Sequence, residues 1–143
     1  MEFQQTIKKP FTIEGKGLHT GHNVKLTVLP APENHGYKFK RVDIEDQPIL
    51  KADVDLVVST ERGTTLEKNS VRVHTTEHVL ASLYGMGIDN AMSELNGDEI
   101  PILDGSCRPF IEKINEVGIE IQKTEKNFFY LKENLKYENL EKQ

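Results

Sequence analysis

Apolar and polar residues alternate along much of the first half of the chain, a pattern typical of strands. The clearest run is VKLTVL at 24–29, where Val24, Leu26 and Val28 would share one face before Pro30 ends the run. Weaker runs predict further strands at 3–8, 11–14, 37–42, 71–74 and 90–95, one or two more within 49–58, and a short last strand at 128–131. The chain should therefore contain a substantial sheet.

Helical spacing of apolar residues appears first at 76–84. The buried face of this helix would be formed by Val79, Leu80 and Leu83. The hydroxyl of Thr75 can accept an N–H group of the first turn, so Thr75 is the predicted N-cap. Gly85 would follow the last turn.

A second helix is predicted from Ser106 or Pro109 to Val117, with Ser106 as N-cap and Gly118 as its end. Its apolar positions, at helical spacing, are Phe110, Ile114 and Val117. Strands followed by a helix, a strand, a helix and a strand suggest an α+β fold. We expect a two-layer sandwich in which a mixed sheet carries both helices on one face.

Composition limits the classes of function without identifying one. The chain has 143 residues, close to the size of one domain, and its net charge of −5 without a long basic run argues against a nucleic-acid or anionic-membrane partner. The single cysteine, Cys107, excludes an internal disulfide and fits a reducing cytosol. No stretch approaches the ~20 apolar residues of a membrane helix, and no signal peptide is evident, so we expect a cytoplasmic protein.

The sequence HTTEH at 74–78 raises the question of a catalytic site. Glu77 and His78 fall in the first turn of the predicted helix, where the helix dipole favours a carboxylate and disfavours an imidazolium. A neutral imidazole is the form that binds a metal. The alternative is that Glu77 is an ordinary acidic residue at a helix start and His78 a solvated side chain.

His74 and His78 are four residues apart, which on one helix would place both on the same face, as zinc ligands often are. The pattern differs from H-E-x-x-H because the glutamate precedes the second histidine. The threonine pair also predicts that His74 lies before the helix, which removes the same-face argument.

Three loops carry further candidates. GKGLHTGHN at 15–23 is either a glycine-rich hairpin connection or a loop that presents His19 to a ligand. TERGTTL at 60–66 is a polar turn, and EIPILDGSCRP at 99–109 contains an Asp104–Gly105 turn before the second helix. We interpret Cys107, in that last turn, as incidental.

Four motifs together resemble a known family. They are GKGLHTGHNVKLTVLPAP, STERGTTL, VHTTEHVLASLYGMGIDNA and EIPILDGSCRPFIE, in this order over about residues 5–131. They are similar to UDP-3-O-acyl-N-acetylglucosamine deacetylase, a zinc hydrolase that commits bacteria to lipid A synthesis. TERGTT and GSCRPF resemble the Bacteroidetes branch, in which the enzyme can be fused to a 3-hydroxyacyl-carrier-protein dehydratase.

The resemblance implies roles for five residues. The T-x-E-H motif makes Glu77 the general base and His78 a zinc ligand, whereas His74 is outside the zinc set. The glycine loop places His19 near the site, and the TERGTT turn places Thr64 and Thr65 at its mouth, near the metal and the acyl group of the UDP-3-O-acyl-N-acetylglucosamine substrate.

One departure from the family is large. The family takes its other zinc ligands from an H-x-x-x-D motif in a second domain that packs against the helices of the first, and none of the five histidines here has an aspartate four residues later. We therefore expect residues 1–126 to form the N-terminal deacetylase domain, and 127–143 to be the start of the missing second domain or a frayed tail. Alone, such a chain would be inactive and bind zinc weakly.

Two other functions remain open. The chain can be a non-enzymatic α+β binding or interaction domain that keeps the fold, which a polar helix face would favour. It can also be an unrelated metallohydrolase that uses His74, His78 and His19.

Overall fold

The computed structural model describes residues 1–141. Its strands are β1 (Phe3–Ile7), β2 (Phe11–Lys16), β3 (Asn23–Pro30), β4 (Tyr37–Arg41), β5 (Ile49–Lys51), β6 (Val57–Ser59), β7 (Thr65–Lys68), β8 (Val71–Val73), β9 (Ala91–Leu95) and β10 (Ile119–Glu125). The helices are η1 (Val54–Leu56, a 3-10 turn), α1 (Glu77–Gly85) and α2 (Arg108–Val117).

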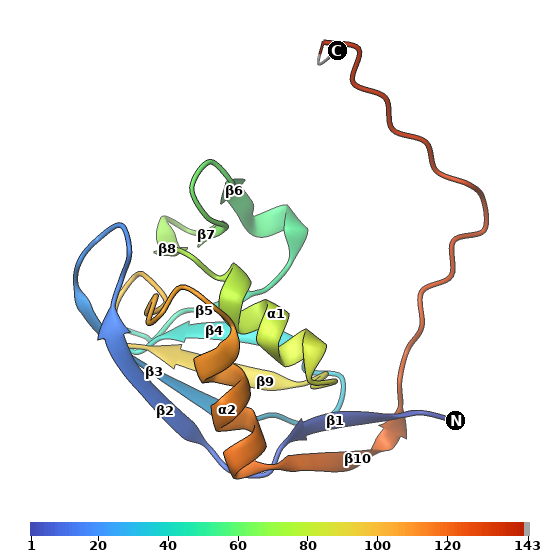
Figure 1. Cartoon of the computed structure of the whole chain (residues 1–143), viewed down its shortest axis with the longest axis horizontal. Coiled ribbons are helices and arrows are strands. Elements are labelled where there is room, and N and C mark those ends of the chain that lie inside the picture. The colour runs from blue at the N-terminus through green and yellow to red at the C-terminus, as the bar shows by residue number, and fades with distance from the viewer. Residues whose placement is uncertain (142–143) are drawn as a thin grey trace.

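The main sheet has five strands in the order β2-β3-β9-β4-β5. Strand β9 pairs antiparallel with β3 and parallel with β4, so the sheet is mixed. Both helices lie over one face of it (Figure 1). The predicted two-layer α+β fold is confirmed.

The core lies between this sheet and the helices. Alternate residues of β3 are buried there, namely Val24, Leu26 and Val28, as the VKLTVL pattern predicts. From the helices, Val79 and Leu83 of α1 and Phe110 and Ile114 of α2 pack into the same core and are almost fully buried. Burial of each such side chain contributes roughly 1.5–3 kcal/mol, and this fixes the helices on the sheet.

A smaller three-stranded sheet, β6-β7-β8, lies at one end of the main sheet (Figure 1). Arg41, at the end of β4, ties the two sheets together. Its Nη1 donates to the carbonyl of Arg72 on β8 at 2.7 Å, while its guanidinium also holds Asp43 at 2.8 and 2.9 Å. The loops that join this small sheet to α1 and to β9 carry most of the candidate site residues.

The C-terminal strand differs from the prediction. The expected strand at 128–131 is wrong, since residues 127–141 contain no helix or strand and their large apolar side chains are exposed. The last strand is instead β10, which pairs antiparallel with β1, and the chain then runs away from the body of the fold (Figure 1). Residues 119–125 find a free edge at β1, whereas 128–131 have no such partner. The last two residues of the expected 127–143 segment lie outside the described residues.

The helix ends also differ from the prediction. Thr75 is not the N-cap of α1, because the cap is Thr76 and neither hydroxyl caps the first turn. Gly85 belongs to the helix, and the positive φ of 74° comes at Gly87. In α2 the N-cap is Cys107, and Ser106 instead accepts the Arg108 N–H at 3.1 Å. Gly118 ends α2 as predicted. Neither helix among residues 1–141 is long and apolar enough to span a membrane.

Candidate functional site

Glu77 is held in place by the TERGTT turn. It opens α1, and its Oε2 accepts the backbone N–H of Thr64 at 2.9 Å. The hydroxyl and N–H of Thr76 bind the Thr64 carbonyl at 3.1 and 3.2 Å, so the turn and the helix start are joined on both sides of Thr64. No donor among residues 1–141 makes a hydrogen bond to Glu77 Oε1, which leaves that oxygen for a ligand or a proton.

His78 lies beside this free oxygen. Its Nε2 is 4.0 Å from Glu77 Oε1, and 27% of its side chain is exposed. The His78 backbone carbonyl is fixed by the Ser82 hydroxyl at 2.7 Å and by the Cys107 thiol at 3.5 Å. Glu77 and His78 therefore form a partly exposed carboxylate–imidazole pair on a well-anchored turn of helix, as the sequence predicted.

His19 approaches the same turn from the β2–β3 hairpin. Its Nε2 lies 2.9 Å from the carbonyl of Arg62. Since a carbonyl oxygen only accepts, Nε2 carries a proton, and in the neutral ring Nδ1 is the acceptor. The hairpin thus joins β2 and β3, as one interpretation had it, and it also places His19 beside the TERGTT turn. The other interpretation, that the loop presents His19 to a ligand, stays a prediction.

Glu99 connects the hairpin to the segment before α1. It is fully buried, and its carboxylate accepts the N–H of His19 at 3.1 and 3.2 Å, the N–H of Thr20 at 2.9 Å and the hydroxyl of Thr75 at 2.9 Å. Burial raises the pKa of this carboxyl, but the donors lower it by more, so the pKa of Glu99 lies below its usual range. The group is therefore a buried anion neutralised by N–H and O–H dipoles.

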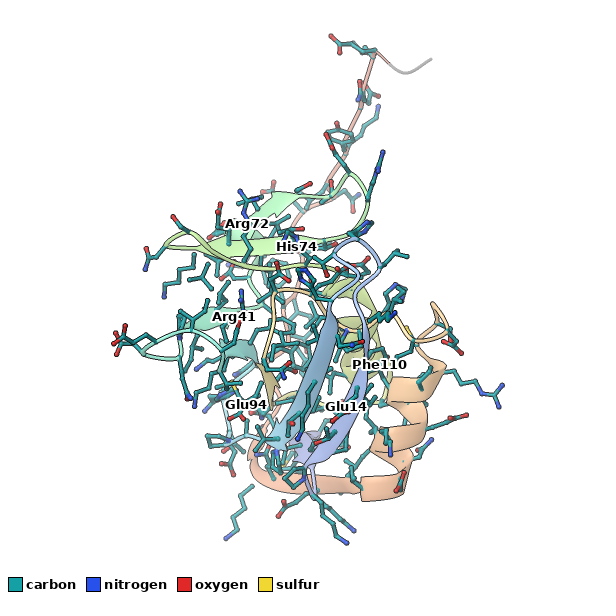
Figure 2. All side chains as sticks on the ribbon, turned by 90° about the vertical axis from the view of Figure 1, so that its left-hand side faces the viewer. Glu14, Arg41, Arg72, His74, Glu94 and Phe110 are labelled. Atoms are coloured by element: carbon teal, nitrogen blue, oxygen red, sulfur yellow. The ribbon has the colours of Figure 1, made fainter. Side chains whose placement is uncertain are left out.

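A pocket of about 380 Å³ opens beside the TERGTT turn, and Glu77 is not part of its lining. Its lining includes His19, Arg62, Gly63, Thr65, Arg72 and His74. Figure 2 shows Arg72 and His74 along the small sheet, well away from Phe110 of α2. The hydroxyl of Thr65 and Nδ1 of His74 are 2.9 Å apart, so His74 is engaged within the pocket wall.

The five predicted site residues divide between two places. His19 and Thr65 line the pocket, while Glu77, His78 and Thr64 do not. Gly63 bridges the two, since it lines the pocket and a Cβ built on it would lie 3.2 Å from Glu77 Oε1. The segment 61–65 is therefore a thin wall between the carboxylate–imidazole pair and the pocket.

The residues present do not make a zinc site by themselves. A catalytic zinc takes about three protein ligands and one open position. Within residues 1–141 no group of three histidine, cysteine or acidic side chains is placed to hold one metal ion. His78 can be one ligand, but the combination of His74, His78 and His19 is not assembled.

Three of these residues carry little signal in the sequence. Glu99 follows Asp98 directly after the Asn96–Gly97 turn, and an acidic pair at such a place suggests only a solvated turn. Arg62 lies in the turn between β6 and β7, and Arg72 lies on β8 opposite Glu67 of β7. The strand pairings that bring both to the pocket are encoded by no local pattern.

The comparisons with known proteins agree with the motifs. The family model for UDP-3-O-acyl N-acetylglycosamine deacetylase (LpxC) matches residues 4–143. A relative from Bacteroides thetaiotaomicron, named bifunctional enzyme LpxC/FabZ, is 48% identical over 134 residues, which are 94% of this chain and 29% of that protein. A UDP-3-O-acyl-N-acetylglucosamine deacetylase from Methylococcus capsulatus is 42% identical over 139 residues, 97% of this chain and 46% of that protein.

The chain spans less than half the length of each of these relatives. The matched family model nevertheless covers residues 4–143, and the matches to these two relatives cover 94% and 97% of this chain. The chain therefore belongs to the UDP-3-O-acyl N-acetylglycosamine deacetylase family.

Proposed function

We propose that this chain forms the first part of the active site of a deacetylase that acts on UDP-3-O-acyl-N-acetylglucosamine. The reaction is hydrolysis of the 2-acetamido group, which releases acetate and leaves a free amine on the sugar, as the committed step of lipid A synthesis. The observation that carries the proposal is the Glu77 carboxylate, held by the Thr64 N–H beside His78, in a member of this family.

Glu77 is the general base in this proposal. The Thr64 N–H occupies Oε2, so Oε1 is the oxygen that takes a proton from the attacking water. The water oxygen then bonds to the acetamido carbonyl carbon, the carbon–nitrogen bond breaks, and the proton passes to the departing sugar nitrogen. Glu77 thereby returns to its ionised form.

We propose that His78 is the single zinc ligand contributed by residues 1–141. The other ligands would come from outside residues 1–141, which is consistent with a chain shorter than its relatives. The expectation that the isolated chain binds zinc weakly can be tested by titrating the purified chain with zinc in a calorimeter. Stoichiometric tight binding lost in His74→Ala would instead support a metal site within this chain.

His19 and Thr65 are proposed to contact the substrate at the pocket beside the base, with Thr64 in the wall between them. Nδ1 of His19 can accept a hydrogen bond from a sugar or ribose hydroxyl, or donate one to a phosphate when the ring is protonated. We further propose that residues 1–126 form one domain and that the tail after it leads to a second deacetylase domain. The LpxC/FabZ relatives support a further fusion to a dehydratase, and the protein is proposed to act in the cytoplasm.

The decisive experiment uses the longer polypeptide that carries this sequence, at the length of its relatives. Acetate release from UDP-3-O-acyl-N-acetylglucosamine is measured for the natural sequence and for Glu77→Gln. The variant keeps an acceptor for the Thr64 N–H but has no base, and its kcat should fall by about 10²–10⁴. Unchanged kcat would reject Glu77 as the base.

The same assay on the isolated 143-residue chain tests whether it is inactive alone. No activity is expected. Deacetylation by the isolated chain that disappears in Glu77→Ala would overturn this expectation.

A binding domain without chemistry is the competing function. Of the described large apolar residues, Tyr84 is the only one on α1 or α2 that is exposed, so the helix layer is more polar than a face buried by a second domain would suggest. A monodisperse monomer by light scattering, together with no deacetylation by the longer polypeptide, would favour this alternative.

A further inference from the structure

Within residues 1–141, the Glu99 carboxylate is the only group whose hydrogen bonds link the glycine-rich hairpin to the segment before α1. Its two oxygens accept from the backbone of the hairpin on one side and from the Thr75 hydroxyl on the other. No lysine or arginine forms an ion pair with it in the described residues. Its negative charge is therefore balanced by donors that come from these two segments alone.

The backbone on both sides is shaped to reach this carboxylate. Thr75 has a φ of 58°, unusual for a β-branched residue and worth about 1–3 kcal/mol of strain, which its hydrogen bond to a buried anion helps to offset. On the hairpin, a Cβ at Gly17 would overlap the Glu99 carboxylate, so only glycine allows the loop to close over it. Both segments are held in otherwise unfavourable arrangements by one residue.

The contacts of Glu99 close a ring around the catalytic turn. Glu99 accepts a hydrogen bond from the Thr75 hydroxyl, and the hydroxyl of the next residue, Thr76, donates to the Thr64 carbonyl. The Thr64 N–H in turn donates to Glu77. On the other side Glu99 holds the His19 N–H, and His19 Nε2 returns to the Arg62 carbonyl in the same turn. A shift of Glu99 would therefore move His19 relative to Glu77.

We propose that Glu99 is a positioning residue that fixes His19 against the TERGTT turn at the entrance to the pocket. It touches no substrate itself. It acts through the His19 and Thr20 N–H groups. The hydrogen bond from Nε2 of the imidazole to the Arg62 carbonyl persists only while Glu99 holds the His19 backbone in place. The link to deacetylation rests on the function proposed above, whereas the positional effect belongs to the chain itself.

The test reads the loop directly by NMR of the isotopically labelled 143-residue chain. In the natural sequence the His19 and Thr20 amides should exchange slowly, and the His19 ring nitrogens should report protonation at Nε2. In Glu99→Gln, an amide NH₂ faces these N–H donors, so both amides should exchange about tenfold faster or more, equal to about 1.4 kcal/mol. The His19 ring should then lose its single protonation pattern.

The matched control is Glu94→Gln. Glu94 lies on β9, faces solvent on the open side of the sheet, and pairs only loosely with Lys40 at 3.9 Å (Figure 2). Neutralising it removes the same charge without touching the ring of contacts, so exchange at His19 and Thr20 should not change. Equal effects of both variants would overturn the proposal, because the result would then reflect charge and not position.

Two further measurements keep the proposal testable if Glu99→Gln fails to fold. Unprotected His19 and Thr20 amides in the natural sequence would overturn it directly. Glu99→Asp keeps the charge but is one methylene too short to reach both segments, and it should accelerate exchange at His19 and Thr20; unchanged exchange would also overturn the proposal.

In the longer polypeptide, Glu99→Gln should raise KM about tenfold and change kcat less than about threefold, since His19 lines the pocket whereas Glu77 does not. A fall in kcat with KM unchanged would overturn the positioning role in substrate binding. If the loop responds as expected but the natural polypeptide shows no deacetylation, the proposed function fails while the positional effect of Glu99 stands.

Discussion

Gly63 shows how a single residue can control the base. It lines the pocket with a φ of 151°, and a Cβ there would lie 3.2 Å from Glu77 Oε1. Gly63→Ala should therefore shift the carboxylate by a few tenths of an ångström and lower kcat of the longer polypeptide by up to about tenfold, less than the ~10²-fold cost of a 1 Å misplacement. Steady-state kinetics measure the effect.

The control for this change is Gly36→Ala. Gly36 also has a positive φ, 69°, but a Cβ there meets nothing within 4 Å. Both variants should lose about 1 kcal/mol or more of stability from backbone strain, and only Gly63→Ala should lose activity. Equal activities would show that Glu77 accommodates the methyl group.

Tyr37 offers a second test at this scale. Burial, with smaller contributions from Asp89 and Tyr84, raises its pKa to about 12, and its hydroxyl donates to the Ile88 carbonyl. Its folded pKa lies above its ordinary value of 10.0, so its stabilising effect is complete below pH 10 and is lost as pH rises towards 12. In an absorbance titration one of the four tyrosines should ionise only near pH 12, and Tyr37→Phe should remove that step.

Sequence reasoning placed Glu77 and His78 together because both depend on one local turn of helix. It missed Glu99 because the partners of that carboxylate lie about 80 residues away along the chain. Local patterns indicate which residues share a face of a helix and which are neighbours, but they do not indicate which loop a buried acidic residue will contact.

The start of α1 illustrates the same limit for a whole element. A threonine before an acidic turn predicts a local N-cap. Here tertiary contacts decide instead, since Thr75 bonds to Glu99 and Thr76 to the Thr64 carbonyl. The helix was predictable from its apolar face, whereas the orientation of its first residues was not.

The Glu99 junction should make the attachment of these segments depend on pH. The folded pKa of Glu99 lies below its ordinary value of 4.5, so its contribution is present above pH 4.5 and is lost as pH falls through the lower folded pKa. The free energy of unfolding of the natural sequence should exceed that of Glu99→Gln at pH 7, and the gap should narrow in acid. Urea unfolding at pH 7 and below pH 4 measures both; a constant gap would reject the ionised form as the source.

At the scale of the molecule, the sheet order is the part that the sequence left open. Most of the strands follow from alternation, although β10 was not predicted. β9 enters between β3 and β4, and β10 pairs with β1 from the opposite end of the chain. Both pairings join residues far apart in sequence, so no local pattern specifies them. The strand wrongly predicted at 128–131 has the same cause, because an apolar run forms a strand only where the edge of a sheet is available to pair with it.

That placement predicts how the chain responds to shortening. The fold is secured up to Lys126, whose N–H donates to the Glu2 carbonyl at 2.8 Å and whose ammonium lies 3.6 Å from Asp89. Beyond it, exposed apolar side chains include Phe129, Tyr137 and Leu140, each more than 75% exposed. A chain ending at Asn127 should therefore keep its free energy of unfolding within about 0.5 kcal/mol.

The shortened chain should also associate less, because exposed apolar segments favour contact between molecules. Urea unfolding and light scattering at several concentrations test both expectations. Ending the chain at Gly118 is the matched control, since it removes β10 and strips β1 of its partner, and it should unfold well before the chain that ends at Asn127. A large loss of stability on removing 128–143 alone would show that the tail packs on the fold.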